Sequence, residues 1–344
     1  MHILLLPGDG VGPEVIQEAR RVLEAAAPAL SFSEADFGGA AVDRHGTPLP
    51  ADTLALCRKV DAILLGAVGG PAWDDAPRDK RPESGLLALR SALGLFSNLR
   101  PIRVPARGID FVIVRELTGG IYFGQPRAYE SGRAYNTMVY ERDEIVRIAG
   151  VAFREAARRQ ADGHRGHVTS VDKANVLEVS RLWREVVSAE HTAALGAPGI
   201  ALAHMYVDNA AMQIVLRPQQ FDVILTGNLF GDILSDVGAA LAGSLGVLPS
   251  ASLGAPGSVP VFEPVHGSAP DVTGTGTANP MGAILSGAML LRHGGLPGAA
   301  ERLESAVDAV LEHGPKTPDL GGSAHTGDVT DAILNHMKAT APVS

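Results

Sequence analysis

Short apolar runs alternate along the chain with longer segments of helical period, which is the pattern of an α/β protein. No fixed-period repeat and no low-complexity linker interrupts it, so we expect two lobes between which the chain crosses more than once. The predicted strands are 3–6, 62–65, 111–114, 223–226 and 259–262. The predicted helices are 13–27, 83–93, 145–157, a helix from about 231, 280–291, 301–312 and 326–337.

Composition agrees with two lobes and narrows the class of function. A chain of 344 residues with 46% hydrophobic content can bury a substantial core and exceeds one average domain. Its net charge of −9 argues against a nucleic-acid or acidic-membrane surface, which needs concentrated Lys and Arg. Cys57 is the only cysteine, which excludes an internal disulfide and fits a reducing compartment. No apolar run reaches membrane length, so a soluble cytoplasmic protein with a small-molecule ligand is expected.

The segment 124–141 is polar, aromatic and only weakly periodic, with Gly132 as a candidate turn. It is typical of an exposed hairpin or arm, and a lone hairpin is marginal in water. Tyr135, Met138, Val139 and Tyr140 would gain most by packing on another surface, which favours a homodimer. A loop that folds back on its own lobe fits the composition equally well.

A glycine-rich turn, Gly8 to Glu14, follows the first predicted strand and opens a helix. Its G-x-G-x-G spacing lacks the third glycine that the Rossmann dinucleotide turn requires, and Pro13 suits the first helical position. The turn is either a tight strand-to-helix connection or a ligand contact, and the sequence leaves both readings open.

Three arginines, Arg90, Arg100 and Arg115, stand in apolar surroundings. A buried guanidinium group needs an anionic partner, and its rigid fork matches a carboxylate. A diacid ligand would use two or three of them. The alternative is that each arginine pairs with an acid of the protein, such as Glu116.

Asp232 and Asp236 lie four residues apart, which places both carboxylates on one helix face. A divalent cation would remove their repulsion, and oxygen ligands without Cys or clustered His favour Mg²⁺ or Mn²⁺ over zinc. Asp208 could supply a third oxygen. The alternative is a pair of solvated aspartates.

Lys173 stands at the end of a β-like run, and near a metal its ammonium group could shuttle a proton. Tyr122, in a glycine-flanked segment, could act as an acid. A surface lysine and a core tyrosine are the alternatives that each residue alone would favour.

A long glycine-rich loop, 266–280, precedes a predicted helix. Such a loop lets backbone N–H groups approach a phosphate, and an acidic residue can accept a hydrogen bond from a ribose hydroxyl. A flexible connector is the alternative.

Taken together, these segments resemble the β-decarboxylating dehydrogenases of the isocitrate/isopropylmalate dehydrogenase family. The resemblance extends from Gly8 to Gly322, and its most specific segments are 114–124, 171–178, 227–236 and 266–280. It implies oxidation and decarboxylation of 3-isopropylmalate to 4-methyl-2-oxopentanoate with reduction of NAD, a step of leucine biosynthesis. A dehydrogenase for another alkylmalate, tartrate or homoisocitrate, and a non-catalytic ligand-binding homologue, are the alternatives.

The resemblance also implies roles for particular residues. Lys173 would serve proton transfer from the C2 hydroxyl, and Tyr122 would protonate the enol left by decarboxylation. Lys173, Asp208 and Asn175 would come from the other subunit, with Asn175 at the substrate. The substrate carboxylates would be held by Arg90, Arg100 and Arg115, and Mg²⁺ or Mn²⁺ by Asp208, Asp232 and Asp236.

The same resemblance implies where the cofactor and the substrate side chain bind. A carboxylate at Asp271 would repel a 2′-phosphate, which favours NAD over NADP. Leu86 and Leu87 suit an isopropyl group, whereas a third substrate carboxylate would ask for a polar or basic partner. The residues expected at NAD are Glu263, His266, Gly267, Ser268, Ala269, Asp271 and Asn279.

The fold implied is the two-domain isopropylmalate-dehydrogenase-like α/β fold, with lobes that share a sheet, and not a Rossmann fold. Residues 1–95 and 243–344 would form the first lobe, with both chain ends and the cofactor loop. Residues 96–242 would form the second lobe, with the metal and catalytic residues, the dimer interface and the arm. The connection between Arg100 and Arg115 is shorter than is common in the family.

Overall fold

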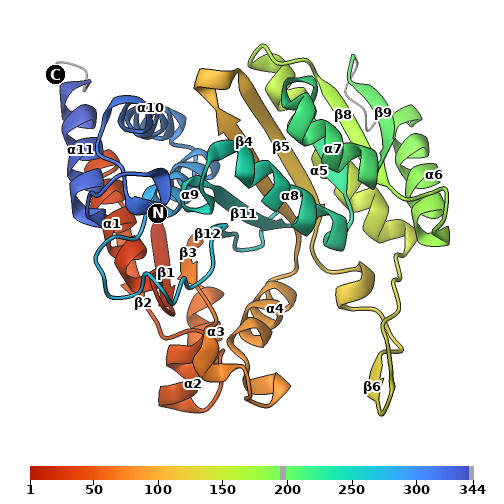
Figure 1. Cartoon of the computed structure of the whole chain (residues 1–344), viewed down its shortest axis with the longest axis horizontal. Helices are drawn as coiled ribbons and strands as arrows, with labels where there is room; N and C mark the ends of the chain where they lie inside the picture. The colour runs from red at the N-terminus through yellow and green to blue at the C-terminus, as the bar shows by residue number, and fades with distance from the viewer. Residues whose placement is uncertain (194–198, 341–344) are drawn as a thin grey trace. The chain divides into compact units, whose positions relative to one another are not determined.

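The computed structural model describes residues 1–193 and 199–340 and divides into two compact units. Unit 1 comprises residues 1–95 and 243–344, and unit 2 comprises residues 96–242. The chain first leaves unit 1 inside a strand, since β4 (Leu95–Val104) begins at the last residue of that segment. Each unit has strands and helices in alternation, so the predicted α/β class is confirmed (Figure 1).

The strands of unit 1 run in the order β2-β1-β3-β12-β11. Neighbouring strands are parallel except β11, which is antiparallel to β12, so the order and directions differ from those of a Rossmann sheet. The central strands are apolar on both faces, as expected where helices cover a parallel sheet. Their bounds are β1 (His2–Gly8), β2 (Ser31–Glu34), β3 (Ala62–Ala67), β11 (Pro249–Gly254) and β12 (Val261–Pro264).

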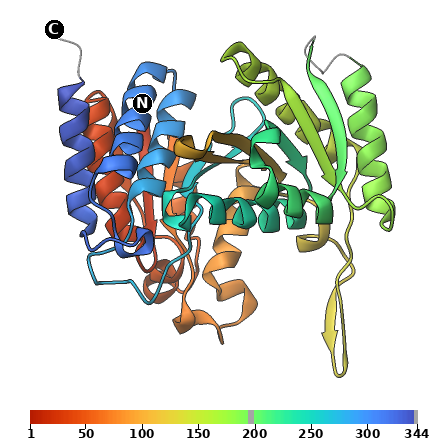
Figure 2. The same cartoon turned by 45° about the horizontal axis from the view of Figure 1, so that its top comes forward.

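Four helices of unit 1 form two layers on one side of these strands, while Cys57 of α3 and Leu89 of α4 pack with Leu4 and Leu6 of β1. Helices α1 and α9 pack directly on the strands, and α10 and α11 pack on α1 and α9 (Figure 2). Proline opens α1, α4 and α10, where its missing N–H costs no hydrogen bond. The bounds are α1 (Gly12–Ala26), α2 (Gly39–His45), α3 (Ala51–Cys57), α4 (Pro82–Ala92), α9 (Met281–His293), α10 (Pro297–His313) and α11 (Thr326–Ala339).

The strands of unit 2 run in the order β4-β5-β10-β8-β9. β4 and β5 are antiparallel, and the short connection between Arg100 and Arg115 is the hairpin that joins them, closed at Gly108 with φ of +60°. The other neighbours are parallel. The bounds are β5 (Ile109–Glu116), β8 (His167–Asp172), β9 (Ala201–Tyr206) and β10 (Val223–Thr226).

The helices of unit 2 cover both faces of its strands. α5 and α6 pack on one face and bury a core that includes Phe153 and Trp183, while α7 and α8 pack on the other face (Figure 1). The bounds are α5 (Arg142–Ala161), α6 (Glu178–Thr192), α7 (Val207–Leu216) and α8 (Asn228–Ala242). Single 3₁₀ turns occur at Pro71–Trp73, Arg78–Lys80, Pro105–Arg107, Gly120–Tyr122, Pro218–Gln220, Leu245–Val247 and Pro318–Leu320.

The predicted hairpin is present as β6 (Ala128–Glu130) and β7 (Arg133–Tyr135), which turn at Gly132 with φ of +77° (Figure 2). The expectation that Tyr140 and Met138 need another surface is wrong. Both lie beyond β7, where the chain has returned to α5, so Tyr140 is buried in the core of unit 2 and Met138 packs against it. Val139 remains exposed, as does Tyr129 near the hairpin tip.

Among the described residues, no helix is both long enough and apolar enough to cross a membrane.

A buried ion pair joins α5 to the strands of unit 2. Arg159 donates through Nε to Asp222 Oδ1 at 2.6 Å and pairs through Nη1 with Asp110 at 2.9 Å. The other oxygen of Asp222 accepts the His167 N–H at 3.0 Å, so this carboxylate connects two strands and the helix.

We predict that Arg159→Ala lowers the free energy of unfolding by about 3–5 kcal/mol, because it leaves the Asp222 carboxylate buried without its cation. Arg158→Ala is the matched control. Arg158 is the preceding residue and pairs with Glu155 and Asp162 through a side chain that is 48% exposed, so the loss should stay below about 1 kcal/mol. Denaturant unfolding of both variants measures the difference, and equal losses would contradict the role given to Asp222.

Candidate active site

Four charged side chains of unit 2 meet where β4, β5 and α8 adjoin. Arg115 on β5 pairs through Nη1 with Asp232 Oδ1 at 2.5 Å. Arg100 on β4 lies 3.5 Å from the same Asp232 oxygen and 3.8 Å from Asp236 Oδ1. The predicted placement of Asp232 and Asp236 on one helix face is confirmed, since both reach the guanidinium group of Arg100 from α8.

Tyr122 joins this cluster from the 3₁₀ turn Gly120–Tyr122. Its hydroxyl donates to Asp232 Oδ2 at 2.9 Å, and the guanidinium carbon of Arg115 lies 5.9 Å from the ring centroid. Burial, and then the hydrogen bond to Asp232 and the charge of that carboxylate, raise the pKa of Tyr122 above its usual value. The phenol therefore stays protonated at neutral pH and is available as a proton donor.

The two aspartates of α8 have pKa values shifted in opposite directions. Burial would raise the pKa of Asp232, but the charges of Arg115 and Arg100 outweigh it and hold this pKa below its usual value. Burial raises the pKa of Asp236 despite Arg100, and Asp232 adds to the rise. A cation bound by both carboxylates would favour the ionised form of each.

Each arginine singled out in the sequence pairs with a protein carboxylate, but the suggested partner Glu116 is wrong. Arg115 pairs with Asp232, whereas Glu116 pairs with Arg147 at 3.3 Å and accepts the N–H groups of Thr118 and Gly119. Successive strand residues point to opposite faces, so Arg115 faces α8 while Glu116 faces α5. Burial raises the pKa of Glu116.

Sequence reasoning missed the polar residues that hold this cluster. Asn228 Oδ1 accepts from Arg115 Nε and Nη2 at 3.1 and 2.8 Å, and Asn228 Nδ2 donates to the carbonyl of Leu117 at 3.0 Å. Asn98 and Ser235 accept from Arg100 at 2.8 and 2.6 Å. Asn228 opens α8 directly after an apolar strand and a glycine, and this position was the signal that could have identified it.

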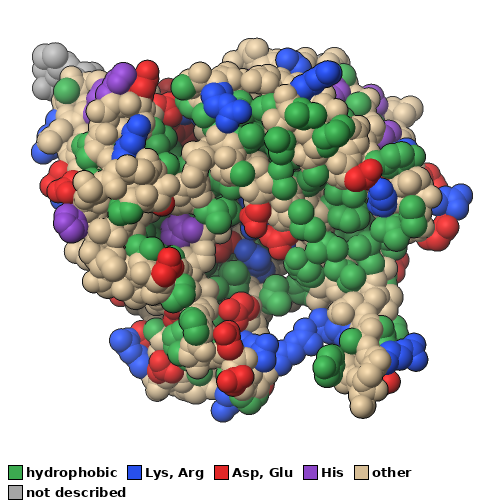
Figure 3. All heavy atoms as spheres, viewed as in Figure 1, with side chains coloured by type: hydrophobic (Ala, Val, Ile, Leu, Met, Phe, Trp, Pro, Cys, Tyr) green, Lys and Arg blue, Asp and Glu red, His purple; other side chains and the backbone are tan. Residues whose placement is uncertain are grey.

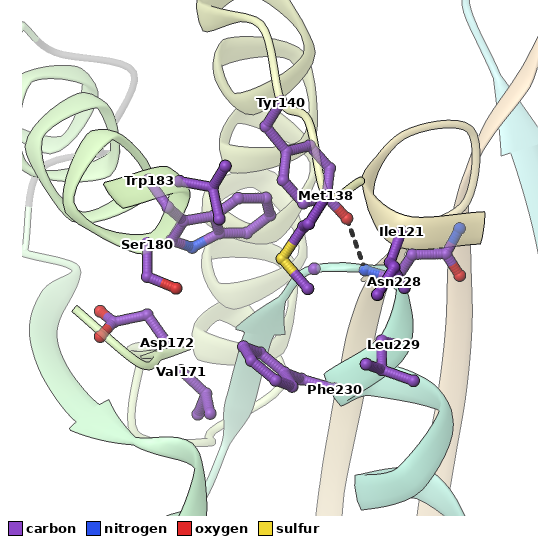
Figure 4. Close-up of a pocket in the computed structure, with 12 residues that line it drawn as sticks. Ile121, Met138, Tyr140, Val171, Asp172, Ser180, Trp183, Asn228, Leu229 and Phe230 are labelled. Atoms are coloured by element: carbon purple, nitrogen blue, oxygen red, sulfur yellow. Dashed lines mark hydrogen bonds between the residues drawn. The ribbon is translucent and has the colours of Figure 1, made fainter. Parts of the chain in front are cut away.

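The start of α8 is fixed by Tyr140. Its buried hydroxyl accepts the backbone N–H of Asn228 at 2.7 Å, as the dashed line in Figure 4 shows. Trp183, Met138 and Phe230 line the same small apolar pocket. The contact therefore ties the helix that carries Asp232 to the core of unit 2.

Lys173 and Asp208 form a second charged group of unit 2. Lys173 follows β8 and its Nζ donates to Asp208 Oδ1 on α7. This hydrogen bond lowers the pKa of Asp208. Asn175 is exposed in the turn after Lys173. Within residues 1–193 and 199–340, no three His, Cys, Asp or Glu side chains form a metal-binding group, so Asp208 does not join the two aspartates of α8 in one chain.

Leu86, Leu87 and Arg90 lie on α4 in unit 1. Arg90 is buried and donates through Nη2 to Glu263 Oε1 on β12 at 2.6 Å, while its buried Nε has no hydrogen-bond partner among the described residues. Both leucines are half-buried. Glu263, one of the residues expected at NAD, is thus the partner of Arg90.

The loop 266–280 borders a recess of about 290 Å³ in unit 1. His266 Nδ1 donates to the carbonyl of Gly267 at 2.8 Å, which leaves Nε2 as a buried acceptor without a partner among the described residues. Burial lowers the pKa of His266, so the ring stays neutral. Ser268 is buried, Ala269 has φ of +43°, and Asp271 is exposed. The recess is lined by His266, Gly267, Ala269, Ala278 and Asn279 from the loop, among others.

We predict that Tyr140→Phe lowers the free energy of unfolding by about 1–3 kcal/mol, because it leaves the buried N–H of Asn228 without an acceptor. Tyr129→Phe removes the same hydroxyl from a side chain that is 93% exposed and should be neutral. Thermal and denaturant unfolding compare the two, and a Tyr140→Phe chain as stable as the control would show that the hydroxyl does not hold α8.

The chain is similar to known proteins in sequence and in structure. The sequence profile described as isocitrate/isopropylmalate dehydrogenase matches residues 2–333. The 3-isopropylmalate dehydrogenase of Salinibacter ruber is 56% identical, over 98% of this chain and 95% of that protein. The enzyme of the same name from Oleidesulfovibrio alaskensis is 54% identical, over 93% of this chain and 94% of that protein.

Solved structures of dehydrogenases match the fold of this chain over nearly its whole length. Isocitrate dehydrogenase from Methylococcus capsulatus superposes with a TM-score of 0.88 at 37% identity, over 98% of this chain and 99% of that one. A β-decarboxylating dehydrogenase from Thermococcus kodakarensis superposes with a TM-score of 0.85 at 39% identity, over 98% and 96%. The chain belongs to the isocitrate/isopropylmalate dehydrogenase family and is an enzyme of that dehydrogenase class.

Proposed function

We propose that this enzyme oxidises and decarboxylates 3-isopropylmalate to 4-methyl-2-oxopentanoate with reduction of NAD, as in leucine biosynthesis. The observation that carries the proposal is the cluster of Arg100, Arg115, Tyr122, Asp232 and Asp236, which combines anion-binding, acidic and cation-binding groups. Relatives 50–56% identical over most of the chain are named for this activity, which supports the substrate. Every side chain that the chemistry needs is present, which disfavours a non-catalytic homologue.

Substrate recognition would rest on charge at one end and apolar contact at the other. Arg90, Arg100 and Arg115 would hold the two carboxylates through bidentate or single N–H donation. Leu86 and Leu87 offer an isopropyl group half-buried apolar surface, and neither can neutralise a third carboxylate. Isocitrate and homoisocitrate, which carry that third carboxylate, are therefore poorer substrates in this proposal, and tartrate lacks the apolar substituent.

The carboxylates of α8 fit a resident Mg²⁺ or Mn²⁺. Asp232 and Asp236 approach one guanidinium group within 3.8 Å from adjacent turns, and hard oxygen ligands are the donors that these cations prefer. Asp208 of a second copy would supply the third carboxylate ligand of the cation. The bound cation would supply Lewis acidity toward the C2 oxygen and the developing enolate.

We infer that the enzyme works as a homodimer with shared sites. Lys173 and Asp208 are in contact with each other and would enter the site of a second copy together with Asn175. Met212, Val215 and Leu216 on α7 and Ile233 on α8 are 50–65% exposed, and hydrophobic side chains lie over these helices on the face shown in Figure 3. Exposed apolar side chains on two packed helices favour burial against an identical pair.

The residues of the chain would divide the proton transfers. Lys173, in its uncharged amine form, would take the proton of the C2 hydroxyl and become an ammonium group, and its contact with Asp208 orients the side chain. Tyr122, held neutral and donating to Asp232, would protonate the enol that remains after loss of CO₂. Arg115 would keep Asp232 ionised beside the reacting centre.

The recess along 266–279 fits NAD. Its neutral His266 presents an unpartnered buried acceptor, and Gly267 and Ala269 line the recess on either side of buried Ser268. Asn279 is buried beside it, and exposed Asp271 would repel the 2′-phosphate of NADP. The carboxylate of Glu263 is already paired with Arg90, so it would accept a hydrogen bond from the ribose while it keeps this ion pair. Bound NAD would accept the hydride from C2.

A substrate panel tests the function. We predict that NAD reduction is fastest with 3-isopropylmalate, with kcat/KM about tenfold or more above isocitrate, homoisocitrate and tartrate. Chelation of divalent cations should abolish turnover, and Mg²⁺ or Mn²⁺ should restore it. Faster turnover of isocitrate would overturn the substrate, and unchanged turnover after chelation would overturn the metal.

Mixed dimers test the shared site. Lys173→Ala and Asp232→Asn should each lower kcat by about 10²- to 10⁴-fold when present in both subunits. Refolding the two variants together should recover about a quarter of wild-type activity, because half of the dimers then carry one site with neither change. No recovery, in a mixture shown by mass spectrometry to contain mixed dimers, would place both residues in one chain's site.

A further inference from the structure

The Gly8 to Glu14 turn packs against the start of the loop 266–280. The N–H of Val11 donates to the carbonyl of Ser268 at 3.0 Å. Gly10 has φ of +59°, and a Cβ there would lie 2.1 Å from the same carbonyl oxygen. The turn therefore needs glycine at this position because the loop backbone lies directly against it.

The glycines of the turn do not form a phosphate cradle. The N–H of Asp9 donates to Ala67 at 2.8 Å, and the N–H of Gly12 donates to Asp9 at 2.9 Å. With Val11 bonded to Ser268, the donors at positions 9, 11 and 12 are satisfied within the protein. Direct phosphate binding by these three N–H groups is thus disfavoured, while Val11 of the same turn lines the recess.

Glu14, at the end of the turn, reaches the other end of the loop. Its Oε1 accepts the N–H of Ala278 at 3.2 Å and the hydroxyl of Thr326. The Thr326 hydroxyl also lies 2.7 Å from the carbonyl of Ala278, and the Thr326 N–H donates to Gly276 at 2.9 Å. One carboxylate from α1 and the first residue of α11 therefore hold the segment 276–278 from two directions.

This segment is a wall of the recess. Thr277, Ala278 and Asn279 line it from the loop, and Val11 lines it from the turn. Glu14 and Thr326 bond the backbone of Gly276 and Ala278, and neither side chain lines the recess itself. A loop with several glycines loses much conformational freedom when it is fixed, and contacts already present in the free protein reduce the cost at binding.

We propose that Glu14 and Thr326 are positioning residues that hold the 276–279 end of the loop in the form that binds NAD. The inference rests on the proposed function, in which this recess takes the cofactor. In this inference the Gly8 to Glu14 turn supports the loop at two points. Val11 bonds the loop at Ser268, and Glu14 bonds it at Ala278.

The test measures NAD affinity of the full-length metal-loaded enzyme by calorimetry, without turnover. Glu14→Ala and Thr326→Val should each raise the Kd for NAD about three- to tenfold, the effect of one or two lost hydrogen bonds. KM for NAD should rise in parallel, while kcat at saturating NAD stays within about twofold of wild type. Glu14→Gln keeps an oxygen acceptor and should rescue most of the affinity.

Thr330→Val is the matched control. Thr330 is buried one turn further along α11, and its hydroxyl bonds the carbonyl of Thr326 within the helix at 3.3 Å. Its Kd for NAD should equal that of wild type. Equal Kd values for Thr326→Val and Thr330→Val, in chains shown to be folded by their thermal transitions, would overturn the inference even if Glu14→Ala does not fold. Absence of NAD binding by the wild type would instead overturn the proposed function.

Discussion

The arrangement of the candidate site depends on one buried guanidinium group. Arg115 is 4% exposed, and two residues bind its guanidinium group. Its Nε and Nη2 donate to Asn228, and its Nη1 pairs with Asp232. A charge so deeply buried is costly unless it is paired and fully hydrogen-bonded. Because Asn228 and Asp232 are one turn apart on α8, satisfying Arg115 fixes that helix against β5.

The consequences of this contact reach both acidic residues of α8. Arg115, with Arg100, keeps Asp232 ionised against the effect of burial. Asp236 is one turn further from Arg115, and its pKa is raised. Tyr122 then finds an ionised acceptor and remains a neutral donor. A proton donor, an ionised carboxylate and a second carboxylate that a cation would ionise therefore follow from the position of a single arginine.

The two units carry different parts of the proposed chemistry. Unit 2 holds Arg100, Arg115, Asp232 and Asp236 on strands and a helix, which position side chains firmly, whereas unit 1 holds the loop 266–280, which is bonded to α1 and α11. Lys173 and Asp208 belong to unit 2, yet they do not join the cation-binding carboxylates of their own chain among the described residues. In the proposed homodimer, a second copy would bring the two groups together.

The sequence by itself determined the family, the α/β class and most of the buried elements. Apolar strands such as 223–226 and amphipathic helices such as 301–312 were predicted within a few residues, because their patterns are local. It missed the strands β2, β4, β9 and β11, whose polar residues interrupt the apolar pattern, and the helices α2, α3, α6 and α7. The spacing of Asp232 and Asp236 was enough to predict that both lie on one helix face, since four residues make about one helical turn.

Only the tertiary structure decided which groups meet. Glu116 is adjacent to Arg115 in sequence, yet strand geometry sends the two to opposite faces, and the partner of Arg115 comes from 117 residues away. Tyr140 packs in its own core because the chain turns back after β7. The turn at Gly8 to Glu14 meets residues 268, 278 and 326 through long-range contacts that no local pattern encodes, so its part in the cofactor loop could be inferred only from the folded chain.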